Sequence, residues 1–376
     1  MKLDDLLKHC VSKGASDIHL HAGMSPHIRV NGKMMPVAPG ILPPQLTEGL
    51  VAQMCNERQR EIFAQKNQVD FAYSIPSTGR FRVNLFRQRG SVSVVLRVIN
   101  ADTSVFAKVK LPGDTMEFFA HQKRGIVLVT GPTGSGKSTT LAAILDCINS
   151  TREEMIVTVE DPIEMLHPNK RSVVVQREIG QDAPSFAEAL VAAMRQDPDV
   201  IMIGEIRDYA TAQAAISAAQ TGHLVFSTLH TMDTIRTINR IMELFPPEER
   251  AIARILFADA LVGVVSQRLL PRADGQGRVA ALEVLRGTLR VKDLIKDEDR
   301  TPELKDALLE GREVGMLAFD DHLAELCSDG VIDFDTGYSA ATSPHEFKLR
   351  VQDGSANKSR EPEPLAVATS RRDRHY

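Results

Sequence analysis

Cysteine is scarce in this chain, and its cysteines are far apart. Only four occur among 376 residues, and no two form a Cys-x-x-Cys pair. Small secreted domains rely on closely spaced disulfides and zinc ribbons on paired cysteines, so the sequence indicates neither class of protein. Such widely spaced cysteines are typical of a protein in a reducing compartment. The four are Cys10, Cys55, Cys147 and Cys327.

Long apolar runs are also missing. The first 16 residues carry five charged side chains, which leaves no apolar centre of the kind that a secretory signal needs. The most apolar long stretch, residues 251–265, is interrupted by Arg254 and Asp259, and no run approaches the roughly 18 apolar residues of a membrane span. We therefore expect a soluble, cytoplasmic protein.

Neither sign of charge dominates. The chain has 45 Lys and Arg against 49 Asp and Glu, which gives a formal net charge of -4. Proteins that hold nucleic acid through their overall charge are strongly basic, so this balance argues against that class. Any phosphate chemistry has to be local.

The pattern changes several times along the chain. At roughly 150 residues per domain, its length predicts two or three domains. Residues 1–100 predict short alternating strands with one or two helices, and residues 112–288 predict an α/β domain with a mostly parallel sheet. Residues 101–111 lose this periodicity and predict a linker, residues 289–351 predict a helical region, and residues 352–376 predict a disordered tail.

Local signals refine this outline. The pair Asn31-Gly32 predicts a hairpin turn, residues 50–63 predict a helix, and the alternation on both sides of Gly90 predicts a second hairpin. Ser185 and Glu188 predict a helix start. Five apolar runs predict strands buried on both faces, at residues 126–130, 155–159, 173–176, 200–203 and 224–227.

A glycine-rich motif, the phosphate loop, occupies residues 131–138. It follows a predicted strand and opens a predicted helix, so the context fits a phosphate-binding loop better than a chance match. Its glycines let backbone N–H groups turn toward phosphate oxygens, Lys137 supplies positive charge, and Ser138 would ligate Mg²⁺. The expected nucleotide-binding residues are Gly131, Pro132, Thr133, Gly134, Ser135, Gly136, Lys137, Ser138 and Thr139.

Two groups of acids are candidates for the carboxylate that a nucleoside triphosphatase needs. Glu205 ends a buried strand and is the expected general base, whereas Gly204 before it cannot ligate a metal. Glu160, Asp161 and Glu164 follow another strand, at the edge where open α/β sheets bind ligands. The first two are candidate Mg²⁺ ligands and the third a candidate catalytic group. Solvated loop charge is the alternative for both groups.

Two histidines flank the strand predicted at residues 224–227. His223 and His230 lie seven positions apart and lack a third ligand, so zinc is not indicated. A role in phosphate sensing or subunit contact is favoured, with an ordinary core histidine as the alternative. His19 and His21 share one face of a predicted strand and offer another possible metal pair.

The predicted hairpin at residues 79–97 contains five arginines and no acid. Its alternation places Arg80, Arg82 and Arg97 opposite the apolar face, where they are free to reach a ligand. One or more would act as an arginine finger, since guanidinium suits charge spread over phosphate oxygens. A solvated basic face is the alternative.

These motifs together resemble the secretion-type ATPase superfamily, and most closely its PilT-like type IV pilus retraction ATPases. The resemblance implies an N-terminal PAS-like α+β domain followed by a RecA-like P-loop ATPase domain with C-terminal helices. It spans about residues 1–350 and rests on Gly14 to Leu20, the phosphate loop, an acidic box at 160–164, an atypical Walker B motif at 197–208, a histidine box at 221–231, Gln267-Arg-Leu-Leu, Gly315-Met and Phe319-Asp320.

The resemblance also implies how the protein works. It implies a Mg²⁺-dependent ATPase that forms a hexameric ring, binds ATP between its domains and powers pilus retraction and twitching motility. An arginine of the N-terminal hairpin and both box histidines would lie near the phosphates. The implied partners are an inner-membrane pilus platform protein and a paralogous retraction ATPase, reached from the cytoplasmic face of the membrane without direct contact to nucleic acid.

Which family member this is stays open. Assembly and secretion ATPases usually carry a longer N-terminal extension and a tetracysteine zinc motif, and this chain has neither, which favours retraction. The stretch at residues 289–297 departs from the retraction pattern, so a PilU-like accessory retraction ATPase remains an alternative.

Two other classes of protein are alternatives to a motor. A nucleic-acid translocase would use the arginines of residues 79–97 as a DNA-binding stripe, but that segment lacks the interleaved exposed aromatics that stack on bases. A non-hydrolysing scaffold would not need both Lys137 and Glu205. For a motor, residues 101–111 are the expected hinge between two domain arrangements.

Overall fold

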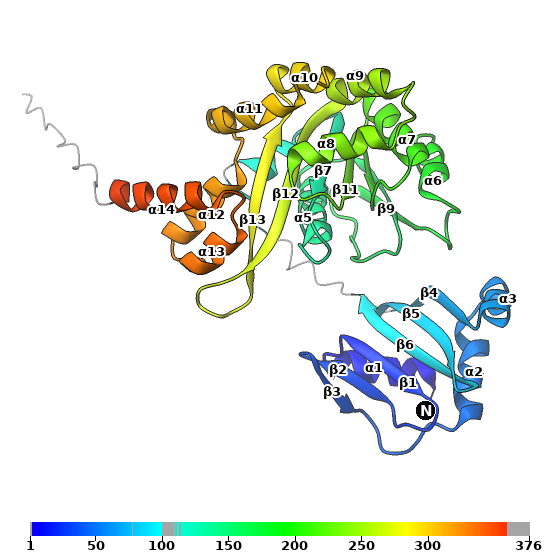
Figure 1. The fold of residues 1–376 in the computed structure, drawn as a ribbon. Coiled ribbons are helices and arrows are strands. Elements are labelled where there is room, and N and C mark those ends of the chain that lie inside the picture. Colours follow the sequence, from blue (N-terminus) through cyan, green and yellow to red (C-terminus); the bar gives the residue numbers. More distant parts are fainter. Residues whose placement is uncertain (1, 77, 100–108, 110, 113, 359–376) are drawn as a thin grey trace, which may run out of the picture.

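The chain forms two separate sheets, as the computed structural model shows (Figure 1). The structure describes residues 2–76, 78–99, 109, 111–112 and 114–358. The predicted linker at residues 101–111 lies almost wholly outside these residues, so the division there stays a prediction.

The six-stranded sheet is antiparallel throughout and belongs to the N-terminal part. Its order is β3-β2-β1-β6-β5-β4. Three helices accompany it, α1 (Leu3–Ser12), α2 (Pro44–Met54) and α3 (Glu57–Lys66), and their apolar residues share a core with the strands. The strands are β1 (Asp17–His21), β2 (His27–Val30), β3 (Lys33–Pro36), β4 (Gln68–Ile75), β5 (Gly79–Gln88) and β6 (Ser91–Ile99).

Both predicted hairpins are confirmed. Asn31 and Gly32 join β2 to β3 with φ angles of 48° and 80°, the left-handed pair that a two-residue hairpin turn requires. The helix predicted at residues 50–63 is wrong, because the chain forms α2 and α3 instead. The Asn56 side chain accepts a bond from the Gln59 N–H at 2.9 Å, and this reciprocal cap starts a new helix.

The seven-stranded sheet is parallel except at one edge and contains all five predicted strands, but the one that starts at Val173 is an edge strand and is not buried on both faces as predicted. Its order is β13-β12-β7-β11-β10-β8-β9, with only β12 and β13 antiparallel. The β12–β13 hairpin was not predicted. The strands are β7 (Gly125–Thr130), β8 (Met155–Glu160), β9 (Val173–Glu178), β10 (Val200–Ile203), β11 (Leu224–Leu229), β12 (Leu261–Pro271) and β13 (Arg278–Arg286).

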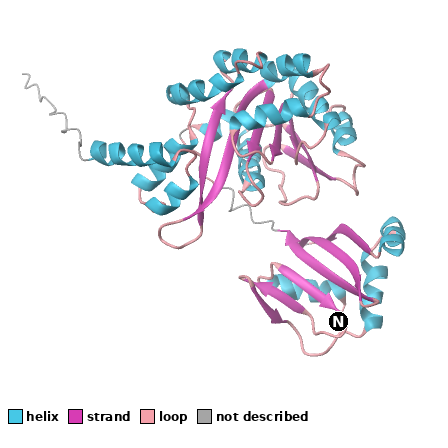
Figure 2. Ribbon diagram, in the orientation of Figure 1, coloured by secondary structure: helices cyan, strands magenta, loops and turns pink. Residues whose placement is uncertain are grey.

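Helices cover both faces of this sheet, as an α/β domain requires (Figure 2). One face packs against α4 (Thr115–Ala120) and α5 (Lys137–Thr151). The predicted cap at Ser185 is confirmed, since its hydroxyl accepts a bond from the Glu188 N–H at 3.3 Å. The other face packs against α6 (Phe186–Ala193), α7 (Tyr209–Gln220), α8 (Thr234–Glu243), α9 (Arg250–Ala260), α10 (Leu289–Lys296) and α11 (Leu304–Glu310).

The last helices dock on the outer edge of the same sheet. Buried Asp320 accepts bonds from the N–H groups of Thr342 and Ser343, both at 2.8 Å, and the Arg268 guanidinium lies 4.1 Å from the centre of the Phe319 ring. These helices are α12 (Phe319–Ser328), α13 (Phe334–Ala340) and α14 (Pro344–Lys358). A disordered tail is predicted from residue 352, but α14 continues to Lys358, so that predicted start is too early. Residues 359–376 lie outside the described chain.

Candidate functional site

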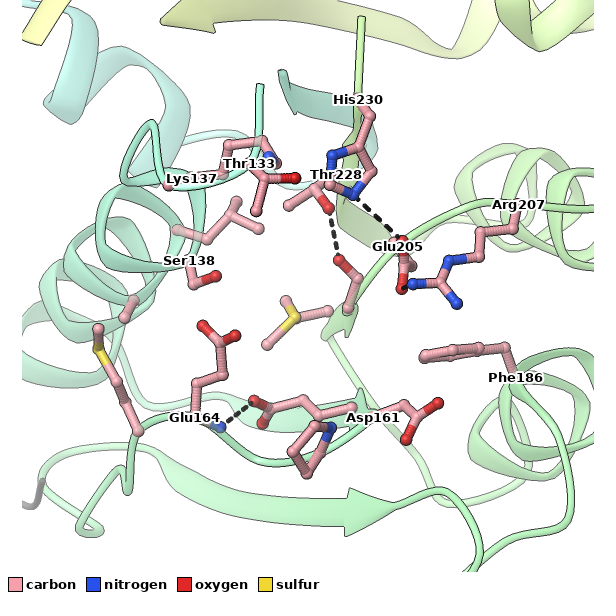
Figure 3. A pocket seen from close by; sticks show the side chains of 18 of the residues that line it. Thr133, Lys137, Ser138, Asp161, Glu164, Phe186, Glu205, Arg207, Thr228 and His230 are labelled. Carbon is pink, nitrogen blue, oxygen red and sulfur yellow. Dashed lines mark hydrogen bonds and ion pairs between the residues drawn. The ribbon is translucent and has the colours of Figure 1, made fainter. Parts of the chain in front are cut away.

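A cavity of about 260 Å³ opens where four parallel strands end. The strands β7, β11, β10 and β8 are neighbours, so their carboxyl ends meet at one edge of the sheet. Lys137 follows β7, His230 follows β11, Glu205 follows β10 and Glu164 follows β8, and all four line the cavity (Figure 3). The topology therefore gathers residues that are up to 93 positions apart in sequence.

Lys137 is the first residue of α5 and is held against its own loop. Its ammonium donates to the carbonyls of Gly131 and Pro132 at 2.8 and 3.1 Å. Burial lowers the pKa of Lys137, and the negative charges of Glu205 and Glu164 oppose that shift. The site thus holds a buried cation opposite two acids.

The phosphate loop contributes unequally to the cavity. Thr133, Gly134, Lys137 and Ser138 line it, whereas the rest of the predicted nucleotide-binding set does not. Gly131 has a φ of 143°, and a Cβ there would collide with the Gln267 carbonyl oxygen. Only glycine fits this close approach between the loop and β12.

The two oxygens of Glu205 have different surroundings. Arg207 pairs with Oε1, while the buried Oε2 accepts no hydrogen bond from the described residues and lies 3.5 Å from His230 Nε2. A carboxylate oxygen that accepts no hydrogen bond keeps its capacity to accept a proton, which is what a general base needs. Arg207 was not singled out from the sequence, although it stands two positions after Glu205 in the same motif.

Glu160, a predicted metal ligand, lines the cavity, but its oxygens are already hydrogen-bonded. Its Oε1 accepts bonds from Thr158 Oγ1 at 2.7 Å and Gln176 Nε2 at 3.0 Å, and its Oε2 accepts one from the Glu164 N–H at 3.4 Å. Burial raises its pKa, and the hydrogen bonds from Gln176, Thr158 and the Glu164 N–H oppose that shift. Glu160 therefore holds the acidic loop in place and so positions Glu164.

The remaining oxygens fit a lightly held Mg²⁺. Ser138, Asp161 and Glu164 line the cavity, and Mg²⁺ usually binds one or two carboxylates and keeps several waters. Within the described residues, no group of three or more His, Cys, Asp or Glu is arranged to hold a metal. His19 and His21 do share a strand face, with ring centroids 5.8 Å apart, but they belong to no such group.

One of the three predicted arginines reaches the cavity. Arg82 of β5 lines it. Arg80 instead pairs with Glu178 of the seven-stranded sheet at 2.9 Å, and Arg97 pairs with Asp17 at 2.9 Å with its side chain 69% exposed. The structure thus selects Arg82 and excludes Arg80 and Arg97 from the cavity in this arrangement.

Only one of the two predicted histidines is brought to the site. His230 lines the cavity, whereas His223 precedes β11 at the opposite end of that strand. Its Nδ1 lies 2.9 Å from the Ala218 carbonyl oxygen and 3.2 Å from Thr221 Oγ1. At about 3.3 Å per residue, the strand separates the two histidines by roughly 20 Å, so one chain cannot bring both to one ligand.

Four side-chain hydroxyls form a row of contacts next to the loops of the cavity. Ser266 Oγ lies 2.7 Å from Thr130 Oγ1, Thr237 Oγ1 lies 3.4 Å from Thr130 Oγ1, and Thr231 Oγ1 lies 2.7 Å from Thr237 Oγ1. Thr130 precedes the phosphate loop and Thr231 follows His230. The row therefore ties two loops of the cavity to each other through α8.

Comparisons with known proteins agree with this arrangement. The family model described as type II/IV secretion system protein matches residues 1–314. The type IV pilus retraction ATPase PilT of Pseudomonas aeruginosa is 40% identical over 92% of this chain and 100% of its own length. The type IV pilus ATPase PilU of the same organism is 39% identical over 94% of this chain and 92% of its own.

A solved structure shows the same fold. The crystal structure of the pilus retraction motor PilT with bound ADP superposes with a TM-score of 0.84 at 41% identity, covering 93% of this chain and 99% of that one. Among the described residues, no helix combines the length and the apolar character needed to cross a bilayer.

Thr237→Val tests the row of hydroxyls. The substitution keeps the volume of the side chain but leaves the hydroxyls of Thr130 and Thr231 without this partner, so we expect the free energy of unfolding to fall by about 1–3 kcal/mol. Chemical denaturation measures this.

Thr211→Val is the matched control for that measurement. The Thr211 hydroxyl, on α7, is also buried but has no hydrogen-bond partner among the described residues. Because this hydroxyl makes no hydrogen bond that valine would lose, its removal should not lower the free energy of unfolding. Equal losses in the two variants would show that the row contributes no specific stability.

Proposed function

The chain belongs to the type II/IV secretion system protein family, and on that premise we propose that it is an ATPase motor that drives retraction of a type IV pilus. The observation that carries the proposal is the cavity. It combines a phosphate loop, a histidine, an arginine from the six-stranded sheet, and a buried carboxylate with one oxygen that accepts no hydrogen bond from the described residues. The length over which PilT aligns, 100% of its own chain, supports the same assignment.

The nucleotide phosphates would bind at the phosphate loop. Backbone N–H groups of residues 133–138 and the Lys137 ammonium offer the positive field that phosphate oxygens need, at the N-terminus of α5. Ser138, with Asp161 or Glu164, would hold Mg²⁺, which when bound neutralises charge on the phosphates.

Glu205 would act as the general base. Its Oε2 takes the proton of the attacking water, while Arg207 holds Oε1 and fixes the orientation of the carboxylate. His230 lies 3.5 Å from the same Oε2 and lines the same cavity, so it would sense the terminal phosphate.

Arg82 would link hydrolysis to motion. It projects from β5 of the six-stranded sheet into a cavity otherwise built by the seven-stranded sheet. An arginine that stabilises charge on the transferred phosphoryl group reaches it only when the two sheets are correctly placed. Residues 101–111 would serve as the hinge between two such placements.

The assembly follows from the family. Six copies would form a ring at the cytoplasmic face of the membrane, where the ring moves an inner-membrane platform protein of the pilus, without direct contact to nucleic acid. An accessory retraction ATPase is the second candidate, because the chain is as similar to PilU, at 39%, as to PilT, at 40%.

Glu205→Gln should separate binding from hydrolysis. The amide keeps the shape of the side chain but cannot accept the proton, so we expect ATP turnover to fall at least about a hundredfold while nucleotide affinity stays near wild type. Lys137→Ala should instead lose nucleotide binding. Steady-state ATPase assays and nucleotide titrations measure both, and retained turnover in Glu205→Gln would remove Glu205 as the base.

Arg82→Ala should lower turnover about a hundredfold without unfolding the protein, since Arg82 is the arginine that reaches the cavity. Arg97→Ala is the matched control, because Arg97 pairs with Asp17 away from the cavity, and it should keep activity within about twofold. If both variants behave alike in the ATPase assay, Arg82 is not a catalytic residue.

Pilus number and twitching in a deletion strain test the cellular role. Excess surface pili without movement, restored by the wild-type chain and not by Glu205→Gln, would support retraction. Partial loss of twitching that becomes complete only when a second retraction ATPase is also deleted would support the accessory role. Loss of pili, or no pilus phenotype, would contradict both.

A further inference from the structure

We propose that Gln267 is a positioning residue. By binding the phosphate loop from β12, Gln267 sets the affinity of that loop for nucleotide. This rests on the proposed function, because it assumes that the loop binds nucleotide phosphates. Gln267 belongs to β12 and does not line the cavity, so it acts through the loop and not by touching the ligand.

One side-chain bond fixes the centre of the loop. Gln267 is 1% exposed, and its Nε2 donates to the Ser135 carbonyl oxygen at 2.6 Å. Ser135 stands between Gly134 and Lys137, which both line the cavity. The bond therefore orients the peptide between the groups that face the phosphates.

The backbone of the loop packs on the same residue at two further points. A Cβ at Gly131 would collide with the Gln267 carbonyl oxygen, and a Cβ at Gly136 would lie 3.1 Å from Gln267 Nε2. Both ends of the loop are thus in close contact with one residue. The contact at Gly131 requires glycine, whereas at Gly136 it is the φ of 90° that favours glycine.

The sheet places Gln267 at this point. Ser266 pairs with Thr130, the last residue of β7, so Gln267 comes level with the first residue of the loop. The next residue, Arg268, binds the Ala340 carbonyl at 3.1 Å and stacks on Phe319. β12 therefore connects the loop to the C-terminal helices through two consecutive side chains.

The unpaired end of the amide argues that this bond has a role. Gln267 Oε1 is buried and accepts no hydrogen bond from the described residues. A buried acceptor without a partner is destabilising, and an apolar side chain of the same length would avoid that loss. The amide therefore matters for its donor end. That end makes the hydrogen bond to the Ser135 carbonyl of the phosphate loop, which an apolar side chain cannot make.

Gln267→Met tests this. It keeps length and volume but removes the donor, so we expect ADP to bind about tenfold more weakly in an equilibrium titration, with the thermal midpoint of the protein without nucleotide near wild type. In the ATPase assay, KM for ATP should rise about tenfold and kcat should stay within about twofold. If Gln267 had only a structural role, its substitution would lower the thermal midpoint and would not raise KM while leaving kcat unchanged.

Gln267→Asn covers the case in which the methionine variant does not fold. Asparagine keeps the amide but is one methylene too short to reach Ser135, so the same loss of ADP affinity is expected. Gln122→Met is the matched control, since Gln122 also donates its amide to a backbone carbonyl, that of Phe118 at 2.9 Å, but before β7 begins. It should bind ADP like wild type.

Wild-type ADP affinity in either Gln267 variant would overturn the proposal, and so would an equal loss in Gln122→Met. Failure of the wild-type chain itself to bind ADP would instead overturn the proposed function, which keeps the two outcomes distinct.

Discussion

Backbone pairing between parallel strands fixes the positions of Lys137, Glu164, Glu205 and His230 in the site. Ile203, the last residue of β10, pairs with Ser227 of β11 and Val159 of β8, and Thr130 of β7 pairs with Leu229. The functional side chains follow these strands within a few residues, so their spacing is inherited from buried hydrogen bonds. Loops carry the chemistry, and a rigid sheet determines where the loops start.

Much of this framework could be predicted from the sequence, because it depends on local patterns. The phosphate loop, Glu205 and the five buried strands are signalled by glycines and apolar runs that need no knowledge of distant residues. The β12–β13 hairpin also had a local signal, since Asp274-Gly275 separates two β-rich runs, but its first strand directly follows a helix and the apolar pattern does not change there.

What the sequence could not decide was which of several similar residues reaches the site. Glu160 and Glu164 look alike in sequence and both line the cavity, yet three donors bind the oxygens of Glu160. His223 is excluded from the cavity because it lies at the opposite end of β11. Arg80 is excluded because it pairs with Glu178. Gln267 carries no charge and lies far along the chain, so its contact with the phosphate loop could only be seen in three dimensions.

One carboxylate joins the two sheets to the acidic loop. Glu178 Oε2 accepts a bond from Arg80 of the six-stranded sheet at 2.9 Å and another from the Ile163 N–H at 3.1 Å, and its side chain is 4% exposed. Ile163 precedes Glu164 of the cavity. If the six-stranded sheet moves and Arg80 leaves, a buried carboxylate loses its charged partner, and the loop that presents Glu164 depends on the same oxygen. The arrangement of the sheets and the shape of the cavity are therefore coupled through this contact, as a motor requires.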